Sequence, residues 1–209
     1  MENPRLPAVR GVAVVGLVLA AGEGRRLGQP KALVTDPDGR TWVRRTVDTC
    51  REGGVGTVYV VVGAAAADVR REIPEDCVVV VASDWAEGMG ESLKAGLAQV
   101  AADQSAADAV VVTLVDTPGV TSAVVRRLAS TAEVDGLARA SYDGVPGHPV
   151  VLGRSHWPGV LAVAAGDRGA RDYLKVQHVS LVECRDVGSG ADIDTLEALG
   201  KWTGVREPG

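Results

Sequence analysis

The chain has 209 residues, enough for one domain whose core needs neither a disulfide nor a metal to hold it together. Its net charge of −5, with 46% apolar and 23% charged residues, fits a globular domain and argues against a surface that coats nucleic acid. Four Trp, three Tyr and no Phe also argue against a base-stacking platform for single strands. We therefore expect no nucleic acid among its partners.

The N-terminal segment has two interpretations. Arg5 and Arg10 precede an apolar run, Val12–Ala21, which has the shape of a signal peptide but is too short to span a membrane. A buried parallel strand explains the same residues, because the run leads directly into a basic, glycine-rich segment typical of a ligand-binding loop. We favour the strand, and expect a cytoplasmic protein with no membrane partner.

Apolar runs then alternate with helical patterns, which predicts four βα units before residue 135. Strands are expected at Val12–Leu19, Val58–Val62, Val78–Ala82, Ala109–Val115, Leu137–Tyr142, His148–Leu152 and Val179–Val182. Helices are expected at Thr41–Arg51, Ala64–Glu72, from near Gly90 through Val100, and at Thr121–Glu133, Trp157–Ala165, Ala170–Lys175 and Asp194–Trp202. This order predicts an α/β fold: a doubly wound, mostly parallel sheet with helices on both faces. We expect a single domain over residues 11–203, with disordered tails at 1–10 and 204–209.

The three cysteines, Cys50, Cys77 and Cys184, are widely spaced and include no Cys-x-x-Cys pair. Their spacing excludes a zinc ribbon and a thioredoxin-like redox site. We expect them to be small, buried apolar residues of a protein in a reducing cytosol.

The loop after the first strand carries three cations, Arg25, Arg26 and Lys31, among small residues that let a ligand approach the backbone. This combination suits a polyanion such as a triphosphate. It is not a dinucleotide fingerprint, because Leu27 stands where that motif needs glycine, and it is not a Walker A loop, because Lys31 follows Pro30. An ordinary βα turn with solvated arginines is the alternative.

Carboxylates follow two later segments. Asp116 ends the fourth strand at the edge where the first loop also lies, so it can hold Mg²⁺ against a triphosphate; an Asp before Pro118 can also simply form a turn. Asp192 and Asp194 share one face if their segment is extended. Because Asp194 is a natural N-cap for the last helix, we favour Asp192 as the second metal ligand.

These motifs together resemble the molybdopterin-type nucleotidyltransferases, with the MobA-like NTP transferase fold, and most closely their CTP:molybdopterin cytidylyltransferase branch. The resemblance covers residues 14 to about 199 and rests on Leu19–Lys31, Gly88–Leu93, Leu114–Pro118, Gly147–Val150, Gly166–Arg171 and Asp192–Thr195. Val115 departs from the family pattern, which has glycine before the aspartate. The resemblance implies a Rossmann-like nucleotidyltransferase, with Mg²⁺ as cofactor and a nucleoside triphosphate and a phosphorylated small molecule as substrates.

The resemblance also assigns roles to residues. Arg26 and Lys31 match the two cations that stabilise the transition state, and Asp116 and Asp192 match the metal ligands. The residues that match nucleotide-binding positions are Ala20, Ala21, Gly22, Glu23, Gly24, Arg25, Gly90 and Ser92. His148 matches an acceptor-binding position, although a single His is often structural. Ser92 can equally be a plain helix cap, and Arg168 and Arg171 either meet the acceptor's phosphate or are solvated.

The implied reaction transfers CMP from CTP to molybdopterin and releases pyrophosphate. Guanylyltransferases of the group usually have Gly where this chain has Ala21, and the extra methyl group should favour a pyrimidine. GTP as donor, a sugar or alcohol phosphate as acceptor, and a non-catalytic nucleotide-binding or chaperone-like module are the alternatives. A partner molybdoenzyme or a homodimer stays open.

Overall fold

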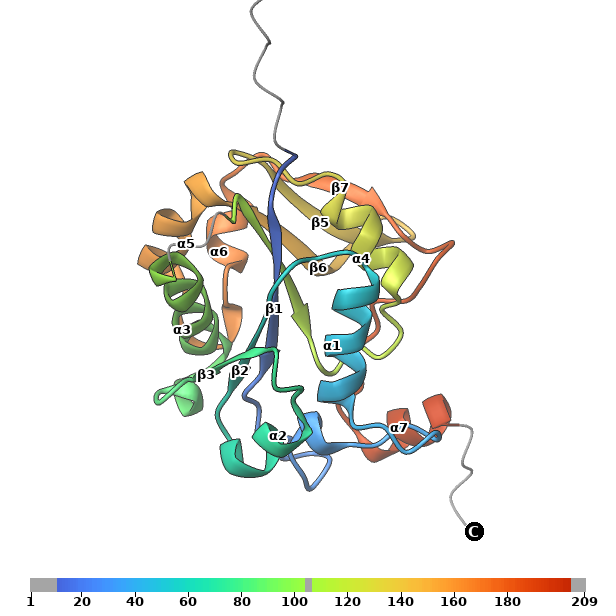
Figure 1. Cartoon of the computed structure of the whole chain (residues 1–209). Coiled ribbons are helices and arrows are strands. Elements are labelled where there is room, and N and C mark those ends of the chain that lie inside the picture. The colour runs from blue at the N-terminus through green and yellow to red at the C-terminus, as the bar shows by residue number, and fades with distance from the viewer. Residues whose placement is uncertain (1–10, 104–106, 204–209) are drawn as a thin grey trace, which may run out of the picture.

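The computed structural model describes residues 11–103 and 107–203, and its centre is one seven-stranded sheet in the order β3-β2-β1-β4-β6-β5-β7 (Figure 1). The strands are β1 Val14–Ala20, β2 Val58–Val62, β3 Val78–Val81, β4 Ala109–Leu114, β5 Leu137–Tyr142, β6 Val145–Gly153 and β7 Ser180–Glu183. β6 runs antiparallel to β4 and β5, and the other neighbouring pairs are parallel. The predicted doubly wound, mostly parallel sheet is confirmed.

Helices cover both faces of this sheet. The α-helices are α1 Trp42–Glu52, α2 Ala66–Glu72, α3 Met89–Ala102, α4 Ser122–Ala129, α5 Trp157–Val163, α6 Arg171–Lys175 and α7 Leu196–Thr203. Short 3₁₀ helices lie at Lys31–Leu33, Trp85–Glu87, Arg154–His156 and Gly166–Arg168. α1, α2 and α4 pack on one face and α3, α5 and α6 on the other, each over its own layer of buried Val, Leu and Ala. Because β1 alternates between these layers, its apolar run is continuous.

Several helices, α4 and α7 among them, differ from the sequence prediction at their ends. The expected helix to Glu133 stops at Ala129, because Ser130 and Thr131 turn their hydroxyls back to carbonyls of the last turn. Thr121 caps the start of the same helix by accepting a hydrogen bond from the Val124 amide, as expected. At α7 the Thr195 hydroxyl accepts from the Ala198 amide, so the prediction that Asp194 caps the last helix is wrong.

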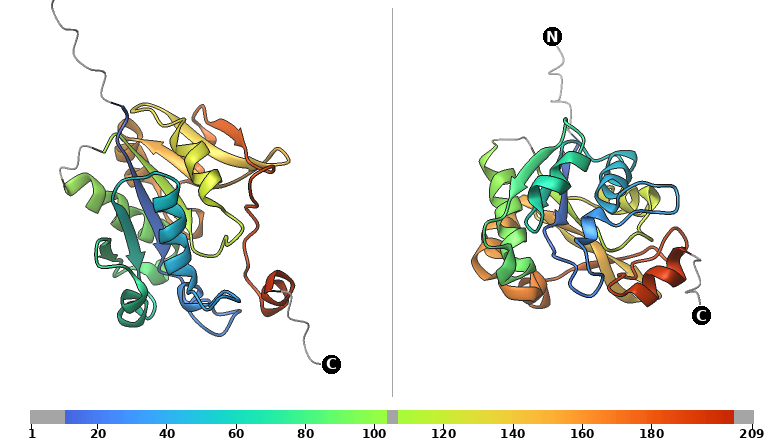
Figure 2. Two further views of the ribbon diagram at one scale, coloured as in Figure 1. Left: turned by 45° about the vertical axis from the view of Figure 1, so that its right-hand side comes forward. Right: turned by 90° about the horizontal axis from the view of Figure 1, so that it is seen from below.

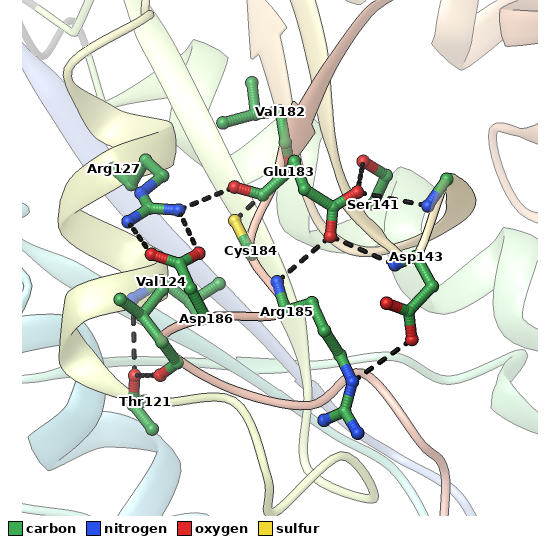
Figure 3. A network of polar contacts seen from close by, with 12 residues as sticks. Thr121, Val124, Arg127, Ser141, Asp143, Val182, Glu183, Cys184, Arg185 and Asp186 are labelled. Carbon is green, nitrogen blue, oxygen red and sulfur yellow. Dashed lines mark hydrogen bonds and ion pairs between the residues drawn. The ribbon is translucent and has the colours of Figure 1, made fainter.

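A carboxylate clamp holds the β5–β6 turn beside β7 (Figure 3). Glu183 accepts hydrogen bonds from the Ser141 hydroxyl and from the amides of Asp143, Gly144 and Arg185. The backbone donors of the turn, led by the Gly144 amide, lower the pKa of Glu183 to about 2. The turn is therefore fixed, and with it the start of β6, which carries His148.

The cysteines and the chain ends complete the description. Cys50 and Cys184 are buried, Cys77 is half-buried, and all three are free; burial raises the pKa of Cys50 to about 11. Within 11–103 and 107–203, no helix has the length and apolar character to cross a bilayer. The predicted tails, 1–10 and 204–209, lie outside the described residues.

Candidate active site

The carboxyl ends of β1 and β4 lie side by side, in register at Leu19 and Leu114. The first loop continues from β1, and Asp116 follows β4 by two residues. Gly24 has φ +68° and a Cβ there would lie 1.9 Å from the Gln29 carbonyl oxygen, so only glycine allows the loop to fold back this tightly. The fold-back brings Lys31 to the end of β4.

Lys31 lies between two carboxylates. Its Nζ donates a hydrogen bond to Asp116 Oδ2 at 2.6 Å and another to Asp194 Oδ1. Arg26 Nη2 reaches Asp194 Oδ2 at 3.3 Å, although the Arg26 side chain is mostly exposed. Three segments far apart in sequence thus converge on one cluster: the first loop, the end of β4 and the approach to α7.

The segment before α7 is drawn into the site by backbone bonds. The chain leaves β7 and returns past the end of α1 to α7 (Figures 1 and 2). The Ser189 amide donates to the Gly119 carbonyl at 2.9 Å, and the Ile193 amide donates to the Asp116 carbonyl at 2.8 Å. Ile193, which precedes Asp194, is buried in one cluster with Leu27, which follows Arg26. This apolar cluster therefore holds the backbone beside Asp194 and beside Arg26 in place.

The charged groups of this cluster shift one another's pKa values. Burial alone would lower the pKa of Lys31, but the carboxylates of Asp116 and Asp194 raise it above its ordinary value. Hydrogen bonding from Lys31, with the charge of Arg26 beyond it, lowers the pKa of Asp194. The ammonium is therefore charged and the Asp194 carboxylate ionised at neutral pH.

The carboxylates also fit a divalent cation. Asp116 Oδ1 is buried and has no hydrogen-bond partner among the described residues, so this oxygen is available to bind a cation. No group of three or more His, Cys, Asp or Glu side chains within the described ranges could hold a metal. Mg²⁺ typically takes one or two carboxylates and completes its shell with phosphate oxygens and water, which suits this arrangement.

The structure places Asp194, not the favoured Asp192, in contact with Lys31 and Arg26. Asp192 is exposed and lines the neighbouring cavity. The preference for Asp192 depended on Asp194 being a helix cap, and Thr195 takes that place instead. We therefore assign the second carboxylate of the cluster to Asp194.

Two cavities meet at this cluster. The first lobe, of about 400 Å³, lies over the first loop and the start of α3, and the second lobe, of about 480 Å³, lies over β6 and α6. The residues that line both are Leu19, Lys31, Met89, Leu114, Asp116 and Asp167. Two adjoining spaces with a cation and a carboxylate between them can hold two substrates with their reacting ends together.

Most of the predicted nucleotide-binding residues line the first lobe. These are Ala21, Gly22, Glu23, Gly24, Arg25 and Ser92. Ala20 instead points into the core, and Gly90 is buried where a Cβ would lie 2.6 Å from the Ala165 backbone, so its glycine allows α3 to pack closely. Arg25 is exposed and paired with Glu23 at 2.8 Å, whereas Arg26 lines the second lobe.

His148 lines the second lobe, as its predicted acceptor role requires. The register of β4 and β6 runs to Val112 opposite Val150, which places His148 toward the carboxyl end of β4. Burial, with the positive charges of Arg139 and Arg171, lowers the pKa of His148 to about 4. Its imidazole is therefore neutral at pH 7.

Sequence reasoning missed three residues of the two lobes. Trp85 lines the first lobe and packs so closely over Gly63 that a Cβ there would lie 2.5 Å from its ring. Asp167 lines both lobes and Arg139 the second. The charge of Arg139, in a strand that is otherwise uncharged, is the one sequence signal that could have identified any of them.

Known proteins are similar to this chain over most of its length. The sequence matches the MobA-like NTP transferase domain over residues 16–182. Nicotine blue oxidoreductase from Paenarthrobacter nicotinovorans is 36% identical over 210 residues, which cover 95% of this chain and 98% of that protein. Purine catabolism protein PucB from Bacillus subtilis (strain 168) is 27% identical, over 90% of this chain and 95% of that one.

Among solved structures, Rv0371c from Mycobacterium tuberculosis H37Rv in complex with manganese is similar, with a TM-score of 0.76 and 28% identity. The similarity covers 93% of this chain and 100% of that one. The match over residues 16–182 spans most of the described sheet and the first loop with its cations. The chain belongs to the MobA-like NTP transferase family and is a nucleotidyltransferase.

Proposed function

We propose that this protein is a Mg²⁺-dependent cytidylyltransferase that transfers CMP from CTP to the phosphate of molybdopterin and releases pyrophosphate. The observation that carries the proposal is the position of Lys31, held by Asp116 and Asp194 where the two lobes meet. A transferase needs this arrangement, because its donor and acceptor must present their reacting atoms to the same charged groups.

The chemistry can be written from these groups. A phosphate oxygen of the acceptor attacks the α-phosphorus of CTP, the bond to the bridging oxygen breaks, and pyrophosphate leaves with the bonding electron pair. Lys31 and Arg26 neutralise the charge that grows on the phosphoryl oxygens. Mg²⁺ held by Asp116 and Asp194 would supply further charge neutralisation of the triphosphate.

The choice of CTP depends on the first lobe. The Ala21 methyl group lines this lobe, and the Ala21 carbonyl accepts a hydrogen bond from the Ala64 amide at 3.0 Å, so the backbone there is held in place. Val115, where the family pattern has glycine, also borders this lobe, but its side chain is buried in the core on the α1 and α4 face. The choice of a single pyrimidine ring over a purine therefore rests on Ala21.

The cofactor and the location are part of the same proposal. Manganese in the complex of the M. tuberculosis relative supports a divalent cation, and the choice of Mg²⁺ over Mn²⁺ is our inference. Three free cysteines support a reducing compartment, for which we propose the cytoplasm.

A pyrophosphate-release screen tests the function. Each of the four NTPs is combined with Mg²⁺ and with molybdopterin, a sugar phosphate or an alcohol phosphate. Release should require CTP and molybdopterin together, and EDTA should abolish it. Faster release with GTP would overturn the choice of base, and release with a sugar phosphate would overturn the acceptor.

A second candidate comes from the relative named nicotine blue oxidoreductase, which is alike over almost its whole length. On this alternative the first lobe would hold a redox nucleotide and the second an aromatic substrate. The same screen decides between the two, if NADH and NADPH oxidation with nicotine blue is followed in parallel. Oxidation without any pyrophosphate release would favour the oxidoreductase.

A further inference from the structure

The second lobe contains an arginine in an unusual place. Arg139 lies in the middle of β5, which pairs with β6 on one side and β7 on the other. Its neighbours Ala138 and Ala140 are buried in the core of the opposite face, and its own side chain is half-buried and lines the second lobe. Its Nε and Nη2 donate to the Gly147 carbonyl, both at 3.3 Å. A guanidinium removed from water in this way costs free energy unless a partner compensates for it.

No carboxylate compensates for Arg139 within the described part of the chain. Arg171, at the start of α6, likewise has no ion pair there, and the two positive charges are close enough that Arg171 adds to the effect of burial in lowering the pKa of Arg139. Other cations of the lobe have carboxylate partners: Lys31 has Asp116 and Asp194. Arg26 shares Asp194 at 3.3 Å, and Arg168 pairs with Asp172 at 3.1 Å. The lobe thus has one end with neighbouring, uncompensated positive charges.

The third group at this end is His148, which is neutral at pH 7 and can donate one hydrogen bond without adding charge. The two guanidinium groups and the imidazole offer hydrogen-bond donors and positive charge at this end of the lobe, whose lining also includes Asp116, Asp167, Asp192 and Asp194. Oxyanions match this chemistry, since a guanidinium grips two oxygens at once.

We propose that Arg139 and Arg171 form a binding site for an oxyanion of the acceptor, with His148 as an additional donor. The proposal deepens the proposed function. That the oxyanion belongs to the acceptor rests on that function, whereas the existence of the anion site does not. The oxyanion has two possible sources, the attacking phosphate or a second acidic group of the acceptor. β6 separates β5 from β4, so the backbone of Arg139 lies about 10 Å from that of β4.

Binding of inorganic phosphate to the intact protein tests the site without any assumption about catalysis. Equilibrium dialysis with radioactive phosphate should show binding at least about tenfold weaker to Arg139→Gln and to Arg171→Gln. Arg168→Gln is the matched control, because it removes the same charge from the same lobe but from an arginine already paired with Asp172. Arg168→Gln should bind phosphate with an affinity within about twofold of that of the wild type.

Unchanged phosphate binding in both Arg139→Gln and Arg171→Gln would overturn the proposal, as would an equal loss in Arg168→Gln. So would a loss confined to Lys31→Ala, because the phosphate would then occupy the junction of the lobes. Should Arg139→Gln fail to fold, as thermal unfolding would reveal, the exposed Arg171 still provides the test.

The transfer assay then identifies the source of the oxyanion. Arg171→Gln should raise KM for the acceptor and leave KM for CTP unchanged. If kcat also falls, the site binds the attacking phosphate. If kcat is unchanged, the site binds a second acidic group of the acceptor. A change confined to KM for CTP would contradict an acceptor site. If no transfer occurs at all, the proposed function fails while the phosphate-binding result stands.

Discussion

Arg25 and Arg26 are adjacent in the sequence and point to different places. Arg26 reaches Asp194 and the second lobe, whereas Arg25 pairs with Glu23 over the first lobe. We expect Arg26→Ala and Lys31→Ala to lower kcat by roughly 100-fold or more, because in the proposed mechanism both cations neutralise charge that grows in the transition state. Arg25→Ala should change kcat by less than about fivefold, as for an exposed pair. Steady-state kinetics of the three variants, with saturating Mg²⁺, provides the measurement. If Arg25→Ala is the most damaging, the assignment of roles in this loop is wrong.

Asp116, Asp194 and Asp192 make a matched set, because the first two contact Lys31 and the third lines only the second lobe. Asp116→Asn and Asp194→Asn should each weaken Mn²⁺ binding in the presence of CTP, followed by electron paramagnetic resonance, and lower kcat by roughly 100-fold. Asp192→Asn should leave both within about fivefold of the wild type, because this exposed side chain makes no contact with Lys31. Unfolding temperatures should change little, since Lys31 keeps one carboxylate partner in each variant. A larger loss with Asp192→Asn than with Asp194→Asn would restore the original assignment.

At the scale of elements, α7 acts as an anchor for the site. The Trp202 ring packs edge-on against Trp42 at 5.9 Å, and Arg45 lies over it at 5.6 Å. Trp42 is buried with Leu27 and Ile193, the neighbours of Arg26 and Asp194. Trp202→Ala should therefore destabilise the fold by about 2 kcal/mol and also lower kcat well below its wild-type value at temperatures where the variant is folded.

The control for Trp202→Ala is Lys201→Ala, one residue earlier on α7. Lys201 is exposed and pairs only with Glu197 among the described residues, so it should leave kcat unchanged. Trp202→Phe, which keeps an aromatic ring, should recover most of the activity. Loss of stability without loss of kcat in Trp202→Ala would limit α7 to a structural role.

The Glu183 clamp makes a prediction about pH. The ordinary pKa of 4.5 falls to about 2 in the folded protein, so the folded state binds fewer protons than the unfolded state between these values. The stability that the clamp contributes is present above pH 4.5 and is lost as pH falls toward 2. Glu183→Gln should lower the unfolding temperature at pH 7, and the difference from the wild type should shrink below pH 4.5. The exposed Glu133→Gln should show no such trend; a difference for Glu183→Gln that is constant with pH would disprove the charged clamp.

At the scale of the whole molecule, the features predicted correctly from the sequence are those that local patterns determine. Val-rich runs between glycine-bounded helices were enough to predict the parallel strands of the sheet, and β2 and β5 begin and end at the expected residues. The reversed direction of β6 follows from the Asp143-Gly144 hairpin turn that joins it to β5, whereas its pairing with β4 is long-range, and no local pattern encodes it. The sequence pattern favoured Asp192 over Asp194, because the contact of Asp194 with Lys31 depends on the Ile193 amide bonding to the Asp116 carbonyl, across 77 residues of chain. Arg139 was missed although its charge stands out in an otherwise uncharged strand, because the cavity that it lines forms only when β6 and α6 come together beside β5.

We propose that Lys31 joins the two lobes into one site of CMP transfer. The most direct measurement follows the label of [α-³²P]CTP in a mixture with Mg²⁺ and molybdopterin, using the wild-type protein and Lys31→Ala. We predict that label appears on the acceptor in step with pyrophosphate release, and that Lys31→Ala slows this transfer by roughly 100-fold or more without unfolding the protein. Label that stays with CTP in the wild-type reaction, or transfer that proceeds equally well in Lys31→Ala, would contradict the claim.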